Sequence, residues 1–422
     1  MSGKRIQIGL SVVLGILVLI AFPAPTSVGV AEVLMALISF AILLHFLLVR
    51  RHFVKLSGAG RLVAWALLAH VTIWIGASLI GISNGIPIMT IVRNLLPQIL
   101  FAPIVLVGMS LDNQDDSRSL ASTLFGIGLM HAIYLVGLGV FAYSGAAGVG
   151  DLELSRITFL DPRTTMPLFL ACIPFGLAML TRPPLRKRLV GLLGCFLAVA
   201  GAFATQTRAQ LLAIFVAVVI FGLLYLLARP TKTTITAILS LTALAMVTIA
   251  VVPTLRNLAL TVVERQRTLG DNARLEDEWL PALHKWEQSG PAALAFGIGL
   301  GVPTPTFSGE EKTYIHNQVI YMAVYTGLIG SIFGWLVYGV AAVVLARRFL
   351  REKDPNDAAA CAAIISLVSY ALFFAVHKIF SFNLMIALLF AIAMRGDRRP
   401  ESKTVRSVAS RPLEPIQPSP TP

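Results

Sequence analysis

The sequence has little charge and few cysteines. Of its 422 residues, 13% are charged and 56% are hydrophobic, and there are 3 cysteines. Several apolar runs reach the roughly 20 residues needed to cross a hydrocarbon core, and so few charges beside them indicate a polytopic helical membrane protein. Cys172, Cys195 and Cys361 all fall inside apolar runs. They offer neither a disulfide framework nor metal-ligand spacing.

Several catalytic motifs are also absent. There is no H-E-x-x-H arrangement and no metal-binding pair of carboxylates, so metal-assisted hydrolysis has no support and we expect no metal and no cofactor. A Ser-His-Asp mechanism lacks its nucleophile elbow. The glycine run 297–301 lacks the strand and helix of a dinucleotide loop, which leaves a tight backbone turn near a ligand as the open alternative. The net charge of +13 is not gathered in one patch, so we expect no nucleic-acid partner.

The apolar runs predict an all-α protein of about twelve transmembrane helices. They cover roughly residues 6–22, 28–49, 62–81, 88–109, 119–143, 164–181, 189–204, 209–228, 233–252, 317–345, 358–376 and 382–394. The expected organisation is therefore spans one to nine over residues 1–252, a polar loop over 253–316 and spans ten to twelve over 317–395. The proline-rich residues 396–422 are expected to form a disordered tail.

The basic residues predict the orientation. If the N-terminus is cytoplasmic, every basic cluster lies inside, as the positive-inside rule requires. These clusters include Arg50-Arg51, Arg186-Lys187-Arg188, Arg347-Arg348 and Arg398-Arg399. Both termini are then cytoplasmic and the loop 253–316 lies outside. Because ATP and nucleotides are absent there, any reaction must use a substrate that is already activated.

The outer loop contains an amphipathic segment. Asp271 or Asn272 is placed to cap a helix, and Pro281 is placed to kink or split it. The apolar residues Leu275, Trp279, Leu283 and Trp286 share one face, and Arg274 with Glu278 forms a four-spaced pair on the polar side. Such a helix serves either as a lid over a substrate or as a packing element of the membrane domain.

Arginines outside the cytoplasm suggest that something anionic is held there, because the positive-inside rule disfavours them. A guanidinium presents planar paired donors that suit phosphate oxygens, whereas a snorkelling anchor is the structural alternative. The candidates are Arg93 in the fourth span, Arg156 and Arg163 before the sixth, Arg208 in the turn between spans seven and eight, and Arg265 and Arg267 in the loop.

His316 supplies a proton acceptor at the end of the loop. Histidine exchanges a proton near neutral pH, and Asn317 and Gln318 beside it are placed to orient the ring or a sugar hydroxyl. The structural alternative is a histidine that only anchors the membrane boundary. His284 and the pair His377-Lys378 are further candidates on the outer side.

Three segments resemble the O-antigen ligase family and its O-antigen polymerase relatives. They are ATQTRAQLLA around Arg208, ARLEDEWLPALHKW followed by the glycine run, and IHNQVIYMAVYTGLIG from Ile315 to Gly330. Their order and spacing, and the single large outer loop before the last spans, are similar as well. The resemblance covers about residues 150–345.

The resemblance implies a GT-C-like glycosyltransferase of the bacterial inner membrane. It implies a polysaccharide donor on undecaprenyl pyrophosphate and an acceptor sugar of the lipid A core, both presented from membrane lipid at the periplasmic face. Arg208, Arg274 and His316 match the family's functional positions, and Arg156 matches a further loop arginine. The implied reaction is a metal-independent inverting transfer, with His316 as general base and arginines on the pyrophosphate. A polymerase acting on the same carrier, or a transporter or flippase of lipid-linked sugars, is the alternative.

Overall fold

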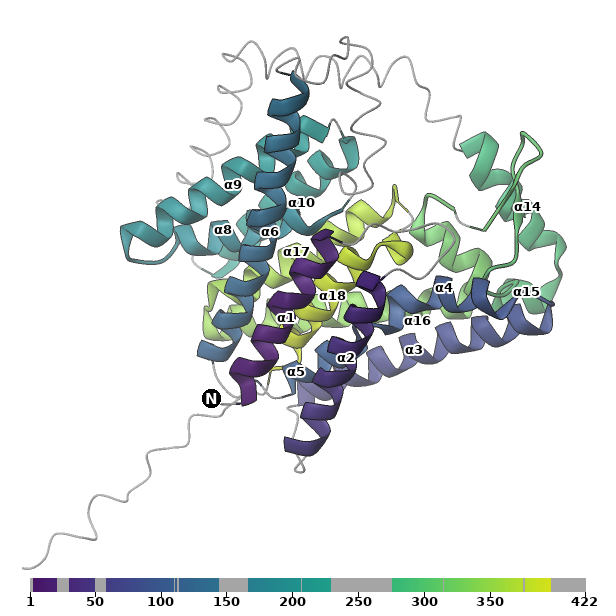
Figure 1. The fold of residues 1–422 in the computed structure, drawn as a ribbon, viewed down its shortest axis with the longest axis horizontal. Helices are drawn as coiled ribbons and strands as arrows, with labels where there is room; N and C mark the ends of the chain where they lie inside the picture. Colours follow the sequence, from purple (N-terminus) through teal and green to yellow (C-terminus); the bar gives the residue numbers. More distant parts are fainter. Residues whose placement is uncertain are drawn as a thin grey trace, which may run out of the picture.

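The computed structural model describes residues 3–20, 30–49, 58–109, 111, 114–143, 166–205, 207–228, 275–313, 315–374 and 376–395. These residues form a helical bundle with one short β hairpin (Figure 1). The bundle contains α1 Gly3–Ile20, α2 Val30–Val49, α3 Gly58–Ser83, α4 Ile88–Ile99, α5 Ala102–Gly108, α6 Gln114–Tyr143, η2 Leu168–Ala171, α8 Cys172–Leu180, α9 Leu185–Thr205, α10 Arg208–Ala228, α16 Gln318–Glu352, α17 Pro355–Ala371, η4 Val376–Lys378 and α18 Phe380–Ala393. Between α10 and α16 lie η3 Leu275–Trp279, α14 Leu280–Gln288, α15 Pro291–Phe296, β1 Thr304–Pro305 and β2 Glu311–Lys312.

Seven of the described helical segments are long and apolar enough to cross a membrane, which confirms a polytopic membrane protein. They are Val30–Leu48, Gly58–Ser83, Ile88–Gly108, Asp115–Val140, Leu185–Thr205, Ala209–Ala228 and Gln318–Glu352. Three predicted spans correspond to the shorter apolar helices Ile8–Ile20, Leu168–Leu180 and Phe380–Ala393, and a fourth corresponds to α17. The predicted span 233–252 and the tail 396–422 lie outside the described residues. The total of twelve therefore stays a prediction.

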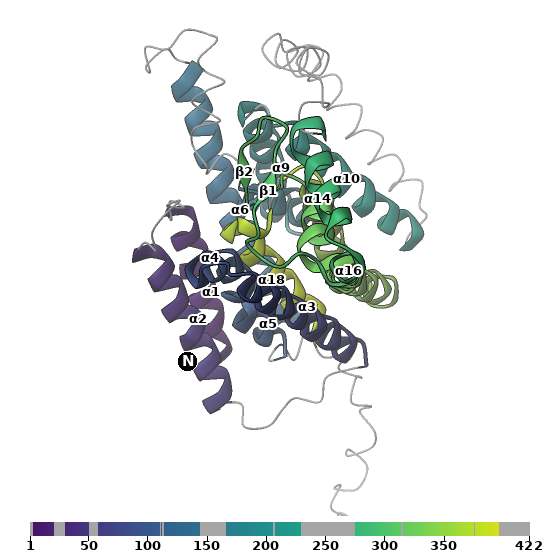
Figure 2. The same cartoon turned by 90° about the vertical axis from the view of Figure 1, so that its right-hand side faces the viewer.

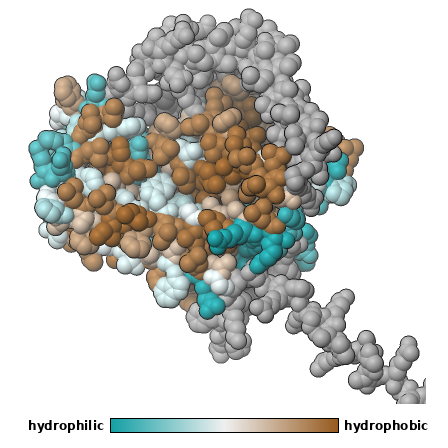
Figure 3. Space-filling view, turned by 180° about the vertical axis from the view of Figure 1, so that it is seen from behind, coloured by the Kyte–Doolittle hydropathy of each residue, from teal (hydrophilic) through white to brown (hydrophobic). Residues whose placement is uncertain are grey.

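The outer surface of the bundle is apolar, as a lipid-facing surface must be. On α9, Leu189, Leu193 and Phe196 are more than half exposed. Figure 3 shows a broad hydrophobic area over one face of the molecule, with hydrophilic side chains gathered toward its edges. Inside the bundle, small residues permit close helix packing. A Cβ atom at Gly176 of α8 would lie 2.8 Å from the carbonyl oxygen of Gly191 in α9.

Helices α3 and α16 pack against each other and carry the outer loop at one end. Within this pair, the buried His70 accepts a hydrogen bond at its Nε2 from Trp74 Nε1 at 3.0 Å. Its Nδ1 lies 3.1 Å from the carbonyl oxygen of Gly334, so the ring satisfies both nitrogens while it joins the two helices. The first residue of α16 follows His316 by two positions. The packing of α16 thus fixes the end of the loop.

The opposite end of the bundle is held by buried ion pairs. Arg348 donates to both carboxylate oxygens of Asp357, at 2.7 and 3.0 Å, and to the carbonyl oxygen of Ile392 at 2.7 Å. Arg395 donates to Glu352 at 2.9 Å and to Asp357 at 3.3 Å. Arg348 and Arg395, which the sequence marks only as indicators of orientation, are 4% and 3% exposed. They join the ends of α16, α17 and α18.

Candidate active site

The outer segment from Leu275 to Phe296 packs on the membrane helices through its apolar side. The predicted amphipathic helix is present in two parts, the π-helical turn η3 and the helix α14. Pro281 stands in the first turn of α14, where a missing amide proton costs nothing, so the proline starts this helix where η3 ends. Trp279, Leu283 and Trp286 pack against a buried cluster of α3 and α16 side chains. These apolar side chains therefore hold the outer loop against the membrane helices.

The glycine run threads between α3 and α16. The amide of Ile298 donates to the carbonyl oxygen of Val324 at 2.9 Å, and the amide of Leu300 donates to that of Ala77 at 2.8 Å. Gly297 has φ 86°, and a Cβ there would collide with the main chain of Tyr325. The run is thus a tight backbone crossing, and the expectation of a ligand beside it stays a prediction. Its glycines permit contact between main chains that side chains would separate.

The helix α16 is adapted to this crossing. Gly327 has φ 72° and ψ 179°, which interrupts the helical backbone near the start of α16. A Cβ at Gly327 would collide with the carbonyl oxygen of Ala295 in α15. α15 and α16 therefore lock against each other through a residue that must be glycine.

A small hairpin carries the chain from the glycine run to His316. Thr304 pairs with Lys312 across β1 and β2, and the tip of the hairpin is bound to η3. The amide of Phe307 donates to the carbonyl oxygen of Asp277 at 2.9 Å, and the amide of Ser308 donates to the Asp277 carboxylate at 3.1 Å. Figure 2 shows the hairpin and α14 near the start of α16. The hairpin thus brings the chain back to η3 just before it reaches His316.

Glu278 of η3 and His316 form a hydrogen-bonded pair. The backbone amide of His316 donates to Glu278 Oε1, and His316 Nδ1 lies 2.7 Å from Glu278 Oε2. Because an ionised carboxylate only accepts, Nδ1 carries a proton and Nε2 of a neutral ring is left as an acceptor. The Glu278 side chain is 6% exposed and that of His316 is 30% exposed. The carboxylate is thus sealed beneath the loop while the imidazole reaches solvent.

Electrostatics favour the ionised form of Glu278. Burial alone raises the pKa of a carboxyl, but the hydrogen bonds from His316, the positive charge that its ring carries when protonated and a smaller contribution from Lys312 outweigh burial. The pKa of Glu278 therefore lies below its ordinary value. The sequence suggested Arg274 as the partner of Glu278, but Arg274 lies outside the described residues and both oxygens of Glu278 contact His316. Local spacing missed a partner 38 residues away.

Asn317 has a structural task in this site. Its side-chain oxygen accepts hydrogen bonds from the amides of Val319 at 2.9 Å and Ile320 at 3.1 Å, which caps the N-terminus of α16. The neighbouring Gln318 is buried. The cap fixes the backbone of residue 316 relative to the long helix.

Two cations on other elements lie close together, and one of them contacts Thr313, three residues before His316. Lys378 of η4 donates to the carbonyl oxygen of Thr313 at 3.4 Å. Burial, assisted by the nearby charge of Arg93, lowers the pKa of Lys378 to about 8. Arg93 is an exposed residue of α4, which packs against η4. The structure thus brings Arg93, one of the predicted binding residues, close to Lys378. From the sequence, Lys378 was only expected to lie on the outer side.

Most of the predicted arginines cannot be placed. Arg156 and Arg163, and likewise Arg265, Arg267 and Arg274, lie outside the described residues. Arg208 is the first residue of α10, but its side chain is not described. Their roles stay predictions. Among the described residues, no group of three or more His, Cys, Asp and Glu side chains is arranged to hold a metal ion.

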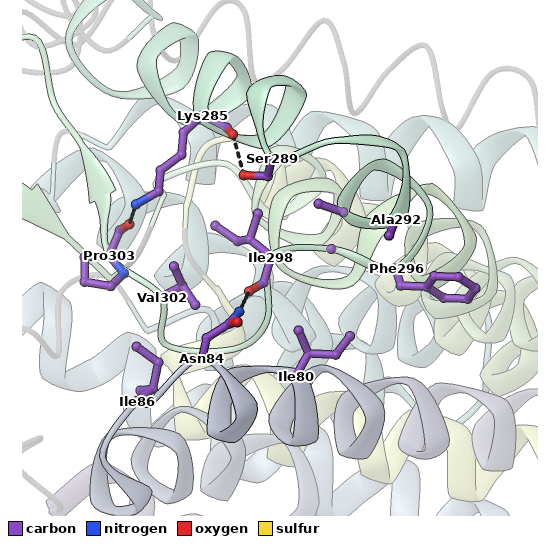
Figure 4. Close-up of a pocket in the computed structure, with 12 residues that line it drawn as sticks. Ile80, Asn84, Ile86, Lys285, Ser289, Ala292, Phe296, Ile298, Val302 and Pro303 are labelled. Atoms are coloured by element: carbon purple, nitrogen blue, oxygen red, sulfur yellow. Dashed lines mark hydrogen bonds between the residues drawn. The ribbon is translucent and has the colours of Figure 1, made fainter.

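A cleft of about 660 Å³ adjoins α14 on the outer side. Figure 4 shows Ile80 of α3 and Asn84 just after that helix below the cleft, and Lys285 of α14 and Ser289 just after that helix above it. Asn84 Nδ2 donates to the carbonyl oxygen of Ile298 at 2.8 Å, and Lys285 Nζ donates to that of Pro303 at 2.6 Å. The lining mixes apolar surfaces with groups that can bind hydroxyls, which suits a sugar chain.

The comparison with protein families agrees with this geometry. The model of the family described as O-antigen ligase matches residues 193–333. The matched segment includes α10, the outer loop, Glu278 and His316, so it confirms the resemblance seen in the three sequence segments. No curated protein matches the chain.

Proposed function

Because residues 193–333 match the model of the O-antigen ligase family, we propose that the chain transfers a polysaccharide from undecaprenyl pyrophosphate to a sugar of the lipid A core. The observation that carries the chemistry is the pairing of the buried Glu278 with the half-buried His316. A histidine oriented by a carboxylate is the usual arrangement of a general base. A sugar hydroxyl needs such a base to become a nucleophile.

The proposed reaction is a single displacement. His316 Nε2 removes the proton of the acceptor hydroxyl while its oxygen attacks the anomeric carbon of the donor sugar. The bond from that carbon to the pyrophosphate oxygen breaks, and the lipid pyrophosphate leaves with the electron pair. Glu278 keeps the ring oriented and stabilises the imidazolium that forms. The anomeric centre is inverted, and the energy comes from breaking the bond between the sugar and its pyrophosphate leaving group, without ATP or a metal.

Cations are proposed to hold the pyrophosphate and to stabilise the charge that develops on it. Arg208 and Arg274 are the main candidates from the family resemblance, with Arg156, Arg163, Arg265 and Arg267 as further ones. Arg93 and Lys378 support this part of the proposal, because two like charges are held near each other on the side of Thr313. The combined positive charge of the two side chains attracts an anion such as pyrophosphate.

The proposed orientation places the His316 end in the periplasm and the Arg348 end in the cytoplasm of the bacterial inner membrane. Arg182, Arg186, Lys187, Arg347 and Arg351 gather at the latter end, in agreement with the positive-inside rule. Residues 253–316 then form a periplasmic lid between nine preceding and three following spans, and both termini are cytoplasmic. The cleft beside Lys285 is proposed to receive part of a glycan.

Deletion of the gene tests the function directly. If the surface polysaccharide then runs on a gel as lipid A core without polymer, and polymer accumulates on undecaprenyl pyrophosphate, the chain is a ligase. Core bearing a single repeat unit would make it a polymerase. Unchanged polysaccharide would refute both.

A further inference from the structure

A second pocket lies at the basic end of the bundle, far along the helices from His316. Its volume is about 380 Å³, and α6, α8, α9 and α17 contribute to its lining. The lining includes Ser122, Met179, Arg186, Lys187, Val190 and Asn356. None of these residues belongs to the outer loop.

A buried amide faces this pocket without a partner. Asn356 is 5% exposed, and among the described residues its Nδ2 has no hydrogen-bond partner. An unsatisfied buried donor costs on the order of 1–3 kcal/mol, so such groups commonly mark a place where an acceptor binds. The N–H groups of Asn356 are therefore available to a hydrogen-bond acceptor in the pocket.

The charges around the pocket favour an anion. Arg186 and Lys187 are exposed and stand in the first turn of α9, whose positive helix end lies at the pocket. Arg182 also lines the pocket, but it is paired with Asp354 at 2.6 Å. Of the two acids in the first turn of α6, Asp115 is paired with Arg118 at 2.9 Å, and neither acid lines the pocket. Among the described residues, Arg186 and Lys187 form no ion pair, so the charge that they bring to the pocket is positive.

The surface next to the pocket is suited to acyl chains. Val190 lines the pocket, and the next residues along the outer face of α9 are Leu189, Leu193 and Phe196, which are 57%, 52% and 62% exposed. A soluble anion would use the polar pocket alone, whereas a phospholipid would use the pocket and this apolar face together. Basic pockets between transmembrane helices at the cytoplasmic side bind anionic lipid headgroups in this way.

We propose that this pocket binds the phosphate of an anionic phospholipid, through Arg186, Lys187 and Asn356. The acyl chains lie along the exposed face of α9. The bound lipid bridges α6, α9 and α17 at the end opposite to His316 and stabilises their packing. The site is independent of the transferase proposal, because its residues take no part in that reaction.

The experiment uses the full chain purified in detergent. Thermal unfolding is followed while phosphatidylglycerol, phosphatidylcholine or inorganic phosphate is added, and bound lipid is counted by native mass spectrometry. We expect phosphatidylglycerol to raise the melting temperature and to be retained. The double variant Arg186→Ala/Lys187→Ala should need a roughly tenfold higher concentration of phosphatidylglycerol for the same rise in melting temperature. Asn356→Asp, which keeps the shape but repels phosphate, should weaken it as well.

The matched control is Arg61→Ala/Arg347→Ala. It removes the same charge from exposed positions that do not line the pocket, and it should respond as the unmodified chain does. Equal loss in both double variants would overturn the proposal, because it would indicate general attraction to the surface. Equal protection by inorganic phosphate, or by phosphatidylcholine, would overturn it as well, since the site would then recognise a soluble anion or any phospholipid.

Discussion

Glu278 accepts hydrogen bonds from both the backbone amide and Nδ1 of His316. The two contacts fix both the position and the rotation of the imidazole. Glu278 is itself held by η3, which the hairpin binds through Asp277. The hairpin and η3 of the outer loop thus position the His316 side chain through Glu278.

Replacing Glu278 with Gln should lower kcat about 10²-fold with little change in KM. The amide can offer an N–H in place of an acceptor, and it does not stabilise the imidazolium. His316→Ala should reduce kcat at least as much. The double variant should lose little beyond His316→Ala, because Glu278 acts through the ring. Transfer from a polyprenyl-pyrophosphate donor by the purified enzyme measures these values.

Glu276→Gln is the control for this prediction. Glu276 is an exposed acid of the same turn η3 and should tolerate the change. Unimpaired transfer by both Glu278→Gln and His316→Ala would rule out the proposed base.

Lys378 should make donor use depend on pH. Its pKa of about 8 means that the amine is charged below that pH and neutral above it. A bound anion needs the charged form, so kcat/KM should fall as pH rises through about 8. Lys378→Ala should lower kcat/KM at neutral pH roughly tenfold or more. Lys378→Arg should retain activity and abolish this alkaline decline, because arginine stays charged. An unchanged decline in Lys378→Arg would assign it to another group.

Gly327→Ala should loosen the outer loop. The new Cβ would collide with the carbonyl oxygen of Ala295, and the backbone conformation, with φ 72° and ψ 179°, adds about 1–3 kcal/mol for a residue other than glycine. We expect a lower melting temperature, faster proteolysis within residues 275–313 and reduced transfer. Gly339→Ala changes the same helix where a Cβ meets nothing within 4 Å, and it should be neutral or slightly stabilising. If both variants behaved alike, the lock between α15 and α16 would not support the site.

Filling the cleft of Figure 4 should impair substrate binding. Ala292 is exposed and lines the cleft, so Ala292→Trp occupies space proposed for a glycan without disturbing the core. We expect KM for one of the two glycan substrates to rise roughly tenfold or more, with the melting temperature unchanged. Glu287→Trp adds the same ring to an exposed position of α14 outside the cleft and should leave KM unchanged. Unaltered KM in Ala292→Trp would exclude the cleft as a binding site.

Local patterns predicted the elements of the site better than its contacts. The repeat of Trp279, Leu283 and Trp286 predicted a helix with one apolar face, because helical periodicity is a property of neighbouring residues. The same reasoning suggested Arg274, four residues away, as a partner of Glu278, which stays a prediction, and it did not indicate His316. Lys378 was noted only as a residue of the outer side, since nothing near it in the sequence indicates that η4 lies beside Thr313. For Asn317, a position beside a candidate base suggested substrate, whereas its oxygen caps α16.

The sequence by itself determined that the chain is a helical membrane protein, where most of its apolar helices lie and which family its central segment resembles. These follow from composition, from runs of apolar residues and from short motifs, all of which are local. Only the tertiary structure decided that Glu278 holds His316, that Lys378 and Arg93 lie together, and that Arg348 and Arg395 are buried with Asp357. Each of these pairings depends on how distant helices pack, because a charge withdrawn from water must find its partner wherever the fold brings one.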